Sequence, residues 1–307
     1  MVKKGFWQRF YHDRQLYVFM LLPVAYIILF HYVPMLGLQI AFKDFQPRYG
    51  IWGSEWIGFS NFTKFFSSYQ FKRVVPNTIT LSVMAIAASF PIPILYALIL
   101  NSLRSERFKK ITSTITNMPH FISTVVLVGI LMQLFNARTG LYGTIMMNLT
   151  GSYPQDLFKS PSNFRQLYVW SGVWQSFGWN SIIYTAALAG VSPDLHEAAQ
   201  IDGATRLQRV IHIDFPCILP TIIIMLILRC GSVMSIGFEK VFLMQNSLNL
   251  SASEVISTYV YKVGLAASGN TDYSYSTAIG MFNSVINLIL ISSVNWIARK
   301  TGDNSLW

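Results

Sequence analysis

Long apolar runs separated by short polar segments dominate this sequence. Six runs are long enough to cross a bilayer as helices, which takes about 20 predominantly apolar residues. A helix satisfies its own backbone hydrogen bonds, so it is the form that such a run adopts in hydrocarbon. The predicted spans cover residues 16–36, 77–100, 111–135, 167–190, 217–237 and 277–298. We therefore predict an all-α integral membrane protein, with one transmembrane domain over residues 1–307.

The composition agrees with this prediction. Of the 307 residues, 52% are hydrophobic and 12% are charged, against roughly 25% charged in an average soluble domain. The net charge of +10 does not indicate nucleic-acid binding, because the Lys and Arg residues flank the apolar runs instead of clustering on a soluble face. Cys217 and Cys230 lie in or beside one apolar run, so neither a disulfide framework nor a CxxC metal site is expected.

The positions of the basic residues predict an orientation. If the N-terminus is cytoplasmic, the cytoplasmic segments hold twelve of the 23 Lys and Arg residues, including the cluster "RSERFKK" after the second span. This positive-inside bias places both termini in the cytoplasm of a cell-membrane protein. The basic residues before the first run resemble a signal peptide, but the run is too long and no A-x-A-like site follows. We expect a retained first span.

The spans carry few ionisable groups. No Asp or Glu lies within them, and Arg229 is their one Lys or Arg. Proton-coupled carriers usually place carboxylates or histidines in their helices. The chain also lacks a GxxxxGK[ST] phosphate-binding loop. If the protein moves a solute, its energy source is expected to be a partner.

The segment between the fourth and fifth spans, residues 191–216, has helix start and stop signals. Ser192 followed by Pro193 predicts a helix start, Gly203 predicts a turn, and Pro216 is expected to end the next helix. The two predicted helices have about nine and eight residues, fewer than the roughly 12–15 that an isolated helix needs in water. They need a surface to dock on.

This loop resembles a known family. "EAAQIDGA" from Glu197 to Ala204, with the following "LP" at residues 219–220, is similar to the EAA motif of permeases in binding-protein-dependent ABC importers. The segments "LLPVAYIILFHYVPMLGLQIAFKDF" and "GFEKVFLM" resemble the sugar-permease branch named for lipoprotein-associated polysaccharide transport. The alternative is a cytoplasmic linker with an accidental EAA.

The resemblance implies a type I ABC importer permease with six spans and no catalytic residue, cofactor or metal of its own. Its implied partners are a second permease in a heterodimer, two ATPase subunits that bind ATP and Mg, and an extracellular lipid-anchored solute-binding protein. The implied cargo is an oligosaccharide, passed inward by alternating access. The residues expected to couple to the ATPase are Glu197, Ala198, Ala199, Asp202, Gly203 and Ala204.

The fourth span has the chemistry of a sugar site, because aromatic faces stack on sugar rings while amides and hydroxyls hydrogen-bond to their hydroxyl groups. Trp and Tyr residues also anchor proteins at membrane interfaces, which is the role expected for Trp170. Glu239 either meets the sugar, caps a helix or pairs with Lys240. The candidate sugar-binding residues are Trp174, Trp179, Asn180, Tyr184, Ser235 and Glu239.

Other polar residues of the spans have simpler interpretations. Asn283 and Asn287 share a helix face, which suits a pore lining or, preferably, an interhelical hydrogen bond. His31 and His120 have no second ligand at metal spacing, so packing is the expected role. Arg229 is expected to bond a partner permease or neighbouring carbonyl groups, because a free guanidinium is costly in hydrocarbon.

Two other classes of function remain as alternatives. A secondary carrier needs ion-binding residues within the membrane and often repeated halves with broken helices. A membrane enzyme that processes glycans needs paired carboxylates, HExxH or an activated nucleophile. The spans offer neither set of residues.

Overall fold

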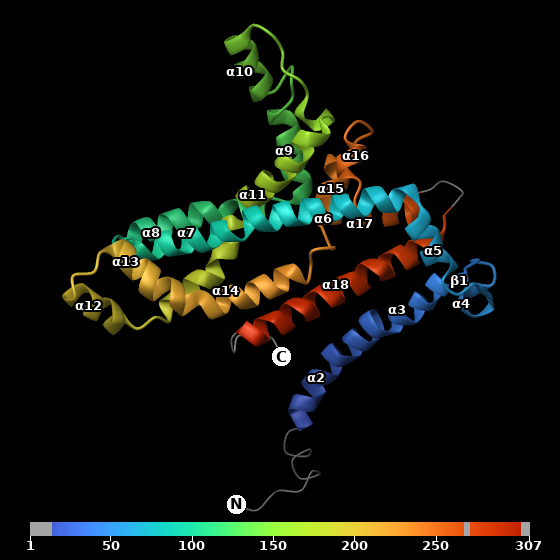
Figure 1. The fold of residues 1–307 in the computed structure, drawn as a ribbon, viewed down its shortest axis with the longest axis horizontal. Coiled ribbons are helices and arrows are strands. Elements are labelled where there is room, and N and C mark those ends of the chain that lie inside the picture. The colour runs from blue at the N-terminus through green and yellow to red at the C-terminus, as the bar shows by residue number, and fades with distance from the viewer. Residues whose placement is uncertain (1–13, 267–270, 302–307) are drawn as a thin grey trace, which may run out of the picture.

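The computed structural model describes residues 14–266 and 271–301. Helices make up most of these residues, and the strands β1 (Lys43–Asp44) and β2 (Glu55–Trp56) pair as a small antiparallel sheet. Long helices lie lengthwise in an elongated bundle, from which α9 and α10 project (Figure 1). Four described helices are long and apolar enough to cross a membrane, or five if one bent pair is a single span. The all-α membrane class is confirmed. By the length and composition of its helices, however, the described chain shows four or five candidate spans and not the predicted six.

The first predicted span, 16–36, lies within a continuous helix from Arg14 to Phe42. None of its most apolar stretch is buried by the rest of the chain, and it diverges from the bundle in Figure 1. Only its end packs against another long helix, α18. Its parts are α2 (Arg14–Ile27), the π-helical turn η1 (Ile28–Tyr32), α3 (Val33–Met35) and the 3-10 helix η2 (Leu36–Phe42). Lipid or a second chain must therefore cover this helix.

The second predicted span, 77–100, is confirmed as part of a helix from Tyr69 to Ser102. It follows the short helices α4 (Gly50–Gly53) and α5 (Ser60–Ser67), and it consists of α6 (Tyr69–Ser89) and α7 (Pro91–Ser102). Ser68 caps its start by accepting a hydrogen bond from the Phe71 amide. Pro91 is tolerated because it lies in the first turn of α7, where a missing N–H costs least.

The third predicted span, 111–135, is wrong as one continuous helix. The chain forms α8 (Glu106–Asn117), the 3-10 turn η3 (Met118–Phe121) and α9 (Thr124–Leu134), with a bend of 95° at the break. Pro119 lies in η3, and Ser123 starts a new helix by accepting from the Val126 amide. These local signals override the apolar length. The helix α10 (Leu141–Thr150) and the turn η4 (Leu157–Lys159) follow.

The fourth predicted span, 167–190, lies in the long helix α11 (Pro161–Ala189). This helix packs against α6, α7, α8 and α14, at the centre of the bundle. Gly178 permits its closest approach to α8, because an added Cβ would lie 2.3 Å from the Thr116 carbonyl oxygen. Polar residues such as Gln175 and Asn180 interrupt its apolar sequence, and it is not among the four apolar helices.

The fifth predicted span, 217–237, is displaced along the chain. After α12 (Pro193–Ile201), one continuous helix runs from Arg206 to Cys230. It comprises α13 (Arg206–Arg209), the π-helical turn η5 (Val210–Asp214) and α14 (Phe215–Cys230). The expectation that Pro216 ends a helix is therefore wrong. Pro216 lies in the first turn of α14, and the wide turn before it is closed by the Phe215 amide donating to Val210.

Residues 231–237 form a turn and an extended segment held by the last helix. The Met234 amide donates to Asn287 Oδ1 at 3.0 Å, and Asn287 Nδ2 donates to Ser235 Oγ at 2.7 Å. These contacts give Asn287 the interhelical role expected from the sequence. They also explain the early end of the fifth span, since the last helix binds this backbone in a non-helical conformation.

The remaining elements complete the bundle. They are α15 (Phe238–Met244), α16 (Leu250–Ser253), α17 (Ile256–Tyr261), the π-helical turn η6 (Lys262–Ala266) and α18 (Tyr273–Thr301). The last of these contains the sixth predicted span, 277–298. One apolar cluster joins α6, α9, α11 and α15, a second surrounds Phe65 and Ile279, and a third joins α7, α11 and α14. The two clusters that include α11 fix the helices on either side of the loop 191–216.

Candidate coupling site

The helix α12 has a defined start and end. Ser192 accepts a hydrogen bond from the Asp194 amide, and Pro193 occupies the first helical position. At the other end Gly203 has φ +77°. The Gly203 and Ala204 amides donate to Gln200 and Ala199 at 3.1 and 2.8 Å. This is a Schellman motif, in which glycine supplies the left-handed residue. The predicted helix and turn are confirmed.

The next helix begins two residues later. Thr205 Oγ1 accepts from the Gln208 amide at 3.4 Å, while Gln208 Oε1 accepts from the Thr205 amide at 2.8 Å. This reciprocal capping box satisfies two N–H groups at the start of the helix. The Schellman motif and the capping box together fix the angle between α12 and α13. The loop is thus a helix–turn–helix with little freedom.

A buried carboxylate ties α12 to the bundle. Asp214, which is 2% exposed, lies in the turn η5. Its Oδ1 atom lies 3.2 Å from His196 Nε2 on α12 and accepts a hydrogen bond from Asn101 Nδ2, on α7, at 3.4 Å. Removing one partner of a buried charged group is costly, because the other is left without compensation. These contacts therefore connect α12 to α7 and to the helix from Arg206 to Cys230.

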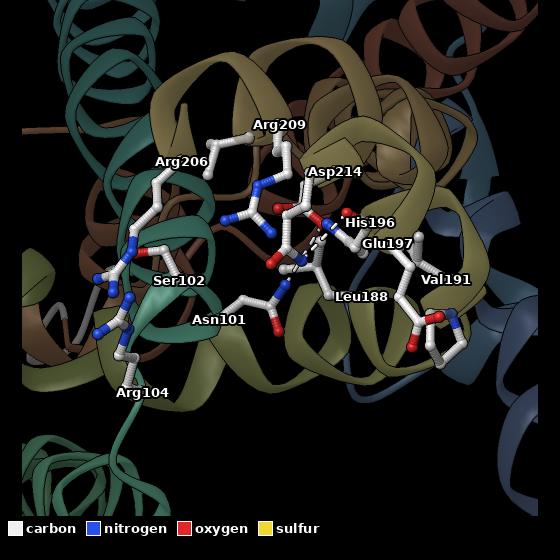
Figure 2. Close-up of a pocket in the computed structure, with 13 residues that line it drawn as sticks. Asn101, Ser102, Arg104, Leu188, Val191, His196, Glu197, Arg206, Arg209 and Asp214 are labelled. Atoms are coloured by element: carbon white, nitrogen blue, oxygen red, sulfur yellow. Dashed lines mark hydrogen bonds and ion pairs between the residues drawn. The ribbon is translucent and has the colours of Figure 1, made fainter. Parts of the chain in front are cut away.

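These residues line a cleft of about 490 Å³ between the loop and the end of α7. Figure 2 shows Arg206 beside Arg104 at one side of the cleft, and Arg209 directed toward Asp214 and Asn101. The Nε atom of Arg209 is buried without a hydrogen-bond partner in the part of the chain that the structure describes. The cleft thus holds three guanidinium groups but only two carboxylates, Asp214 and Glu197.

Several side chains of the helix–turn–helix are exposed. Glu197 and Ala198 are exposed, and within residues 14–266 and 271–301 Glu197 forms no ion pair. Ile201 is 87% exposed and Leu207 is 68% exposed. Exposed apolar side chains and a carboxylate without an ion pair on one short loop are typical of a protein-binding surface.

The predicted coupling residues occupy one short stretch. Glu197, Ala198 and Ala199 lie on α12, while Asp202, Gly203 and Ala204 form the turn. Sequence reasoning missed His196, Asp214 and Asn101, which hold this stretch in place. Asn101 is far from the loop in sequence, and a buried Asp in an amphipathic helix has no pattern that separates it from a solvated one. The adjacent apolar residues 210, 211, 213 and 215 offered a weak signal.

The predicted sugar-binding residues do not share one site. Trp174 lies with Trp170 on the side of α11 that faces α9, where they line an apolar cleft of about 320 Å³. Trp170 Nε1 donates to Gln166 Oε1 at 3.1 Å, and its ring is exposed, as an interfacial anchor requires. Asn180 lines a different, more polar cavity between α6, α11 and α14.

The other candidates are also dispersed. The Trp179 ring stacks on His120 at 4.5 Å, so His120 has the packing role expected of it. Tyr184 is 3% exposed within the cluster of α7, α11 and α14, and the hydroxyl of Ser235 accepts from Asn287. Burial removes Tyr184 from contact with sugar in this conformation.

Glu239 lies exposed at the start of α15 and does not pair with Lys240, whose ammonium group donates to the Tyr168 carbonyl oxygen at 2.9 Å. Glu239 also does not lie at the end of a long helix, because the helix that begins at Arg206 already ends at Cys230. A position at the end of a span, expected from the sequence, is therefore wrong for Glu239. Its contact with sugar stays a prediction.

A protein-family model matches most of the chain. The family model for the binding-protein-dependent transport system inner membrane component matches residues 89–303. The chain belongs to this family, and the loop 191–216 lies within the matched region.

Two relatives from Bacillus subtilis (strain 168) match over nearly the whole length. The chain is 42% identical to protein LplB, over 96% of this chain and 92% of the relative. It is 39% identical to the polygalacturonan/rhamnogalacturonan transport system permease protein YteP, over 96% and 91%. The similarity to both relatives thus extends over nearly the whole chain.

Two solved structures share the fold. A bacterial ABC transporter involved in the import of the acidic polysaccharide alginate contains a chain with 37% identity and a TM-score of 0.87, over 96% of this chain and 98% of that one. A bacterial alginate ABC transporter in complex with a periplasmic protein bound to an alginate pentasaccharide contains one with 35% identity and a TM-score of 0.89, over 99% and 100%. The fold is that of a type I ABC importer permease.

Proposed function

We propose that this chain is the permease subunit of an ATP-driven importer that moves an oligosaccharide into the cytoplasm. The observation that carries the proposal is the helix–turn–helix at residues 193–209, which is fixed at both ends and tied to the bundle through Asp214. Relatives named for polygalacturonan, rhamnogalacturonan and alginate transport support a carbohydrate cargo. The chain itself is a transport subunit and not an enzyme.

The proposed assembly contains a second permease, two ATPase subunits that bind ATP and Mg, and an extracellular lipid-anchored solute-binding protein. The unburied helix from Arg14 to Phe42 supports a heterodimer, because a second permease can cover it. The exposed Glu197, Ile201 and Leu207 support an ATPase partner at the loop. The related structure with a bound periplasmic protein supports delivery of the sugar from outside.

The proposed topology has six membrane crossings with both termini in the cytoplasm. Four crossings are the long apolar helices, the fifth is α11, and the sixth is the bent pair α8 and α9. A polar central helix is acceptable in a membrane when other helices surround it. The basic residues Arg104 and Arg206 line the cleft between the loop 191–216 and the end of α7. Because Lys and Arg are enriched in cytoplasmic loops, they support a cytoplasmic position for this loop.

In the proposed mechanism, ATP binding closes the ATPase subunits, and α12 moves with the ATPase surface on which it docks. The contact between His196 and Asp214 passes this movement to the helix from Arg206 to Cys230, and Asn101 passes it to the end of α7. Both helices pack against α11. Movement at the loop thus changes the packing around the central helix, where Asn180 lines a cavity.

Purification of the tagged chain from its native membrane tests this function. We expect a second permease and an ATPase to co-purify, and vesicles containing the complex to take up a labelled oligosaccharide only with ATP and the binding protein. A stable oligomer of this chain alone that transports sugar without an ATPase would contradict the proposal.

A further inference from the structure

A cavity of about 350 Å³ lies where α6, α11, α14 and the start of α15 meet. We call it the central cavity, and the lining residues used below are Ser89, Gln175, Ser176, Asn180, Arg229 and Lys240. Ser89 is the last residue of α6, which continues into α7, so the cavity lies near the middle of that long helix.

The central cavity has a charge imbalance. Arg229 and Lys240 both line it, and no Asp or Glu is among the lining residues. Among the residues that the structure describes, neither cation forms an ion pair with a carboxylate. Two cations that line one partly enclosed cavity repel, and burial without a counter-charge is unfavourable. The site is therefore short of negative charge.

Lys240 is held in a defined position. The residue is 9% exposed, and its Nζ atom donates to the Tyr168 carbonyl oxygen at 2.9 Å. The same Nζ atom lies 4.9 Å from the centroid of the Tyr168 ring. Gly172 makes room for the ammonium group, since an added Cβ would lie 3.2 Å from Nζ. The ammonium still has donors left for a ligand.

Arg229 complements this fixed charge. Its guanidinium makes no hydrogen bond within residues 14–266 and 271–301, and it carries five N–H donors in a planar arrangement. That arrangement matches the two oxygens of a carboxylate. The neutral side chains of Gln175, Ser176 and Asn180 complete the lining with groups that suit sugar hydroxyls. A neutral sugar needs only these three, whereas a sugar with a carboxylate also uses the two cations.

We infer that the central cavity binds the carboxylate of an acidic oligosaccharide, one built from uronic acid units, through Arg229 and Lys240. This inference rests on the proposed function and specifies its substrate. Gln175, Ser176 and Asn180 bind hydroxyl groups of the same sugar unit. Arg229 and Lys240 thereby select acidic over neutral chains of equal length.

Uptake into vesicles containing the complete importer and its binding protein tests this inference. The probes are galacturonate, mannuronate and guluronate trisaccharides, each beside its carboxyl-reduced neutral counterpart. Arg229→Gln and Lys240→Gln are expected to lower uptake of the acidic probe at least tenfold and to leave uptake of its neutral counterpart within twofold. Lys159→Gln, which changes an exposed cation on η4 that is not among the lining residues of this cavity, is expected to change neither.

Each other outcome is informative. Wild-type uptake of neutral trisaccharides only, or an equal loss of acidic and neutral uptake in both variants, would overturn the inference while leaving an ATP-driven sugar importer in place. Loss of the second permease from purified Arg229→Gln complex, restored in Arg229→Lys, would mean that a carboxylate of the partner pairs with Arg229, and would also overturn it. Absence of any ATP-dependent sugar uptake by wild-type vesicles would contradict the proposed function itself.

Discussion

His196 Nε2 lies 3.2 Å from Asp214 Oδ1, and this contact connects a short exposed helix to the start of a membrane-length one. The carboxylate is buried, whereas α12 is largely exposed. We expect His196→Ala to cost about 1–3 kcal/mol of local stability, because the buried Asp214 loses a polar partner and keeps its hydrogen bond from Asn101. ATP hydrolysis stimulated by the loaded binding protein should then fall severalfold in the assembled importer.

His212→Ala is the matched control, because His212 is exposed and its Nδ1 atom contacts the Gln208 carbonyl of its own helix. Its stimulated ATPase rate should match that of the wild type. Equal rates in His196→Ala and wild type would show that this contact does not transmit movement.

Gly203 has φ +77° and open space around it, so a side chain there has no steric clash with a neighbour. The cost of Gly203→Val is instead in the backbone, on the order of 1–2 kcal/mol or more for a β-branched residue. We expect α13 to change direction relative to α12, and coupled uptake to fall while the complex still assembles. The readout is the ratio of sugar transported to ATP hydrolysed.

Gly190→Ala serves as the comparison, because Gly190 ends α11 with φ −85° and an added Cβ would lie 3.4 Å from its nearest neighbour. Its transport ratio should be unchanged. If the Gly203→Val importer keeps the wild-type ratio of sugar transported to ATP hydrolysed, the Schellman motif has no role in coupling.

Gly178 permits contact between α11 and α8. An added Cβ would lie 2.3 Å from the Thr116 carbonyl oxygen and 2.8 Å from Asn117 Oδ1. Gly178→Ala should therefore force the helices apart and destabilise the assembly by about 1–3 kcal/mol. Gly129→Ala, in α9 with nothing within 4 Å of its Cβ, should not. Thermal unfolding of the two purified complexes measures the difference, and equal melting temperatures would contradict this packing.

Asn180 and Trp174 lie on different faces of α11, so substituting each one tests which face the sugar contacts. Asn180→Ala leaves sugar hydroxyl groups unpaired in the central cavity, at about 1–3 kcal/mol, which is about 5- to 150-fold in apparent affinity. Trp174→Ala changes only the apolar cleft toward α9 and should leave uptake of a short oligosaccharide near the wild-type level. The measurement is concentration-dependent uptake in vesicles. The reverse pattern would place the sugar path on the other face.

The apolar pattern predicted the long helices because bilayer length leaves few alternatives. It failed where polar signals act locally: Pro119 and Ser123 divide the third span, and Asn287 holds residues 231–237 out of a helix. Pro216 was misjudged because its effect depends on position. Pro216 lies in the first turn of α14, directly after the π-helical turn η5, where the missing N–H of proline is tolerated.

The coupling loop was predictable because all of its determinants are adjacent in sequence. Ser192, Gly203 and Thr205 each act on backbone groups within a few residues. The sugar-binding set was not predictable in the same way. Trp174, Trp179 and Asn180 are close in sequence but lie on different faces of α11, and the cations of the central cavity come from α14 and α15. Only tertiary packing determines which of them meet.

Cross-linking at Ala198 tests the central claim that α12 docks on an ATPase. Cys217 and Cys230 are first replaced by serine, so that Ala198→Cys supplies the single thiol, and a short thiol-to-amine reagent is added to the transport-competent complex. Ser152→Cys, exposed directly after α10, is the control, because α10 projects from the bundle away from α12 in Figure 1. We predict a covalent product with the ATPase from Ala198→Cys alone, with a yield that changes when ATP is added. A transport-competent complex that gives no ATPase product from Ala198→Cys, or equal product from both sites, would contradict the account.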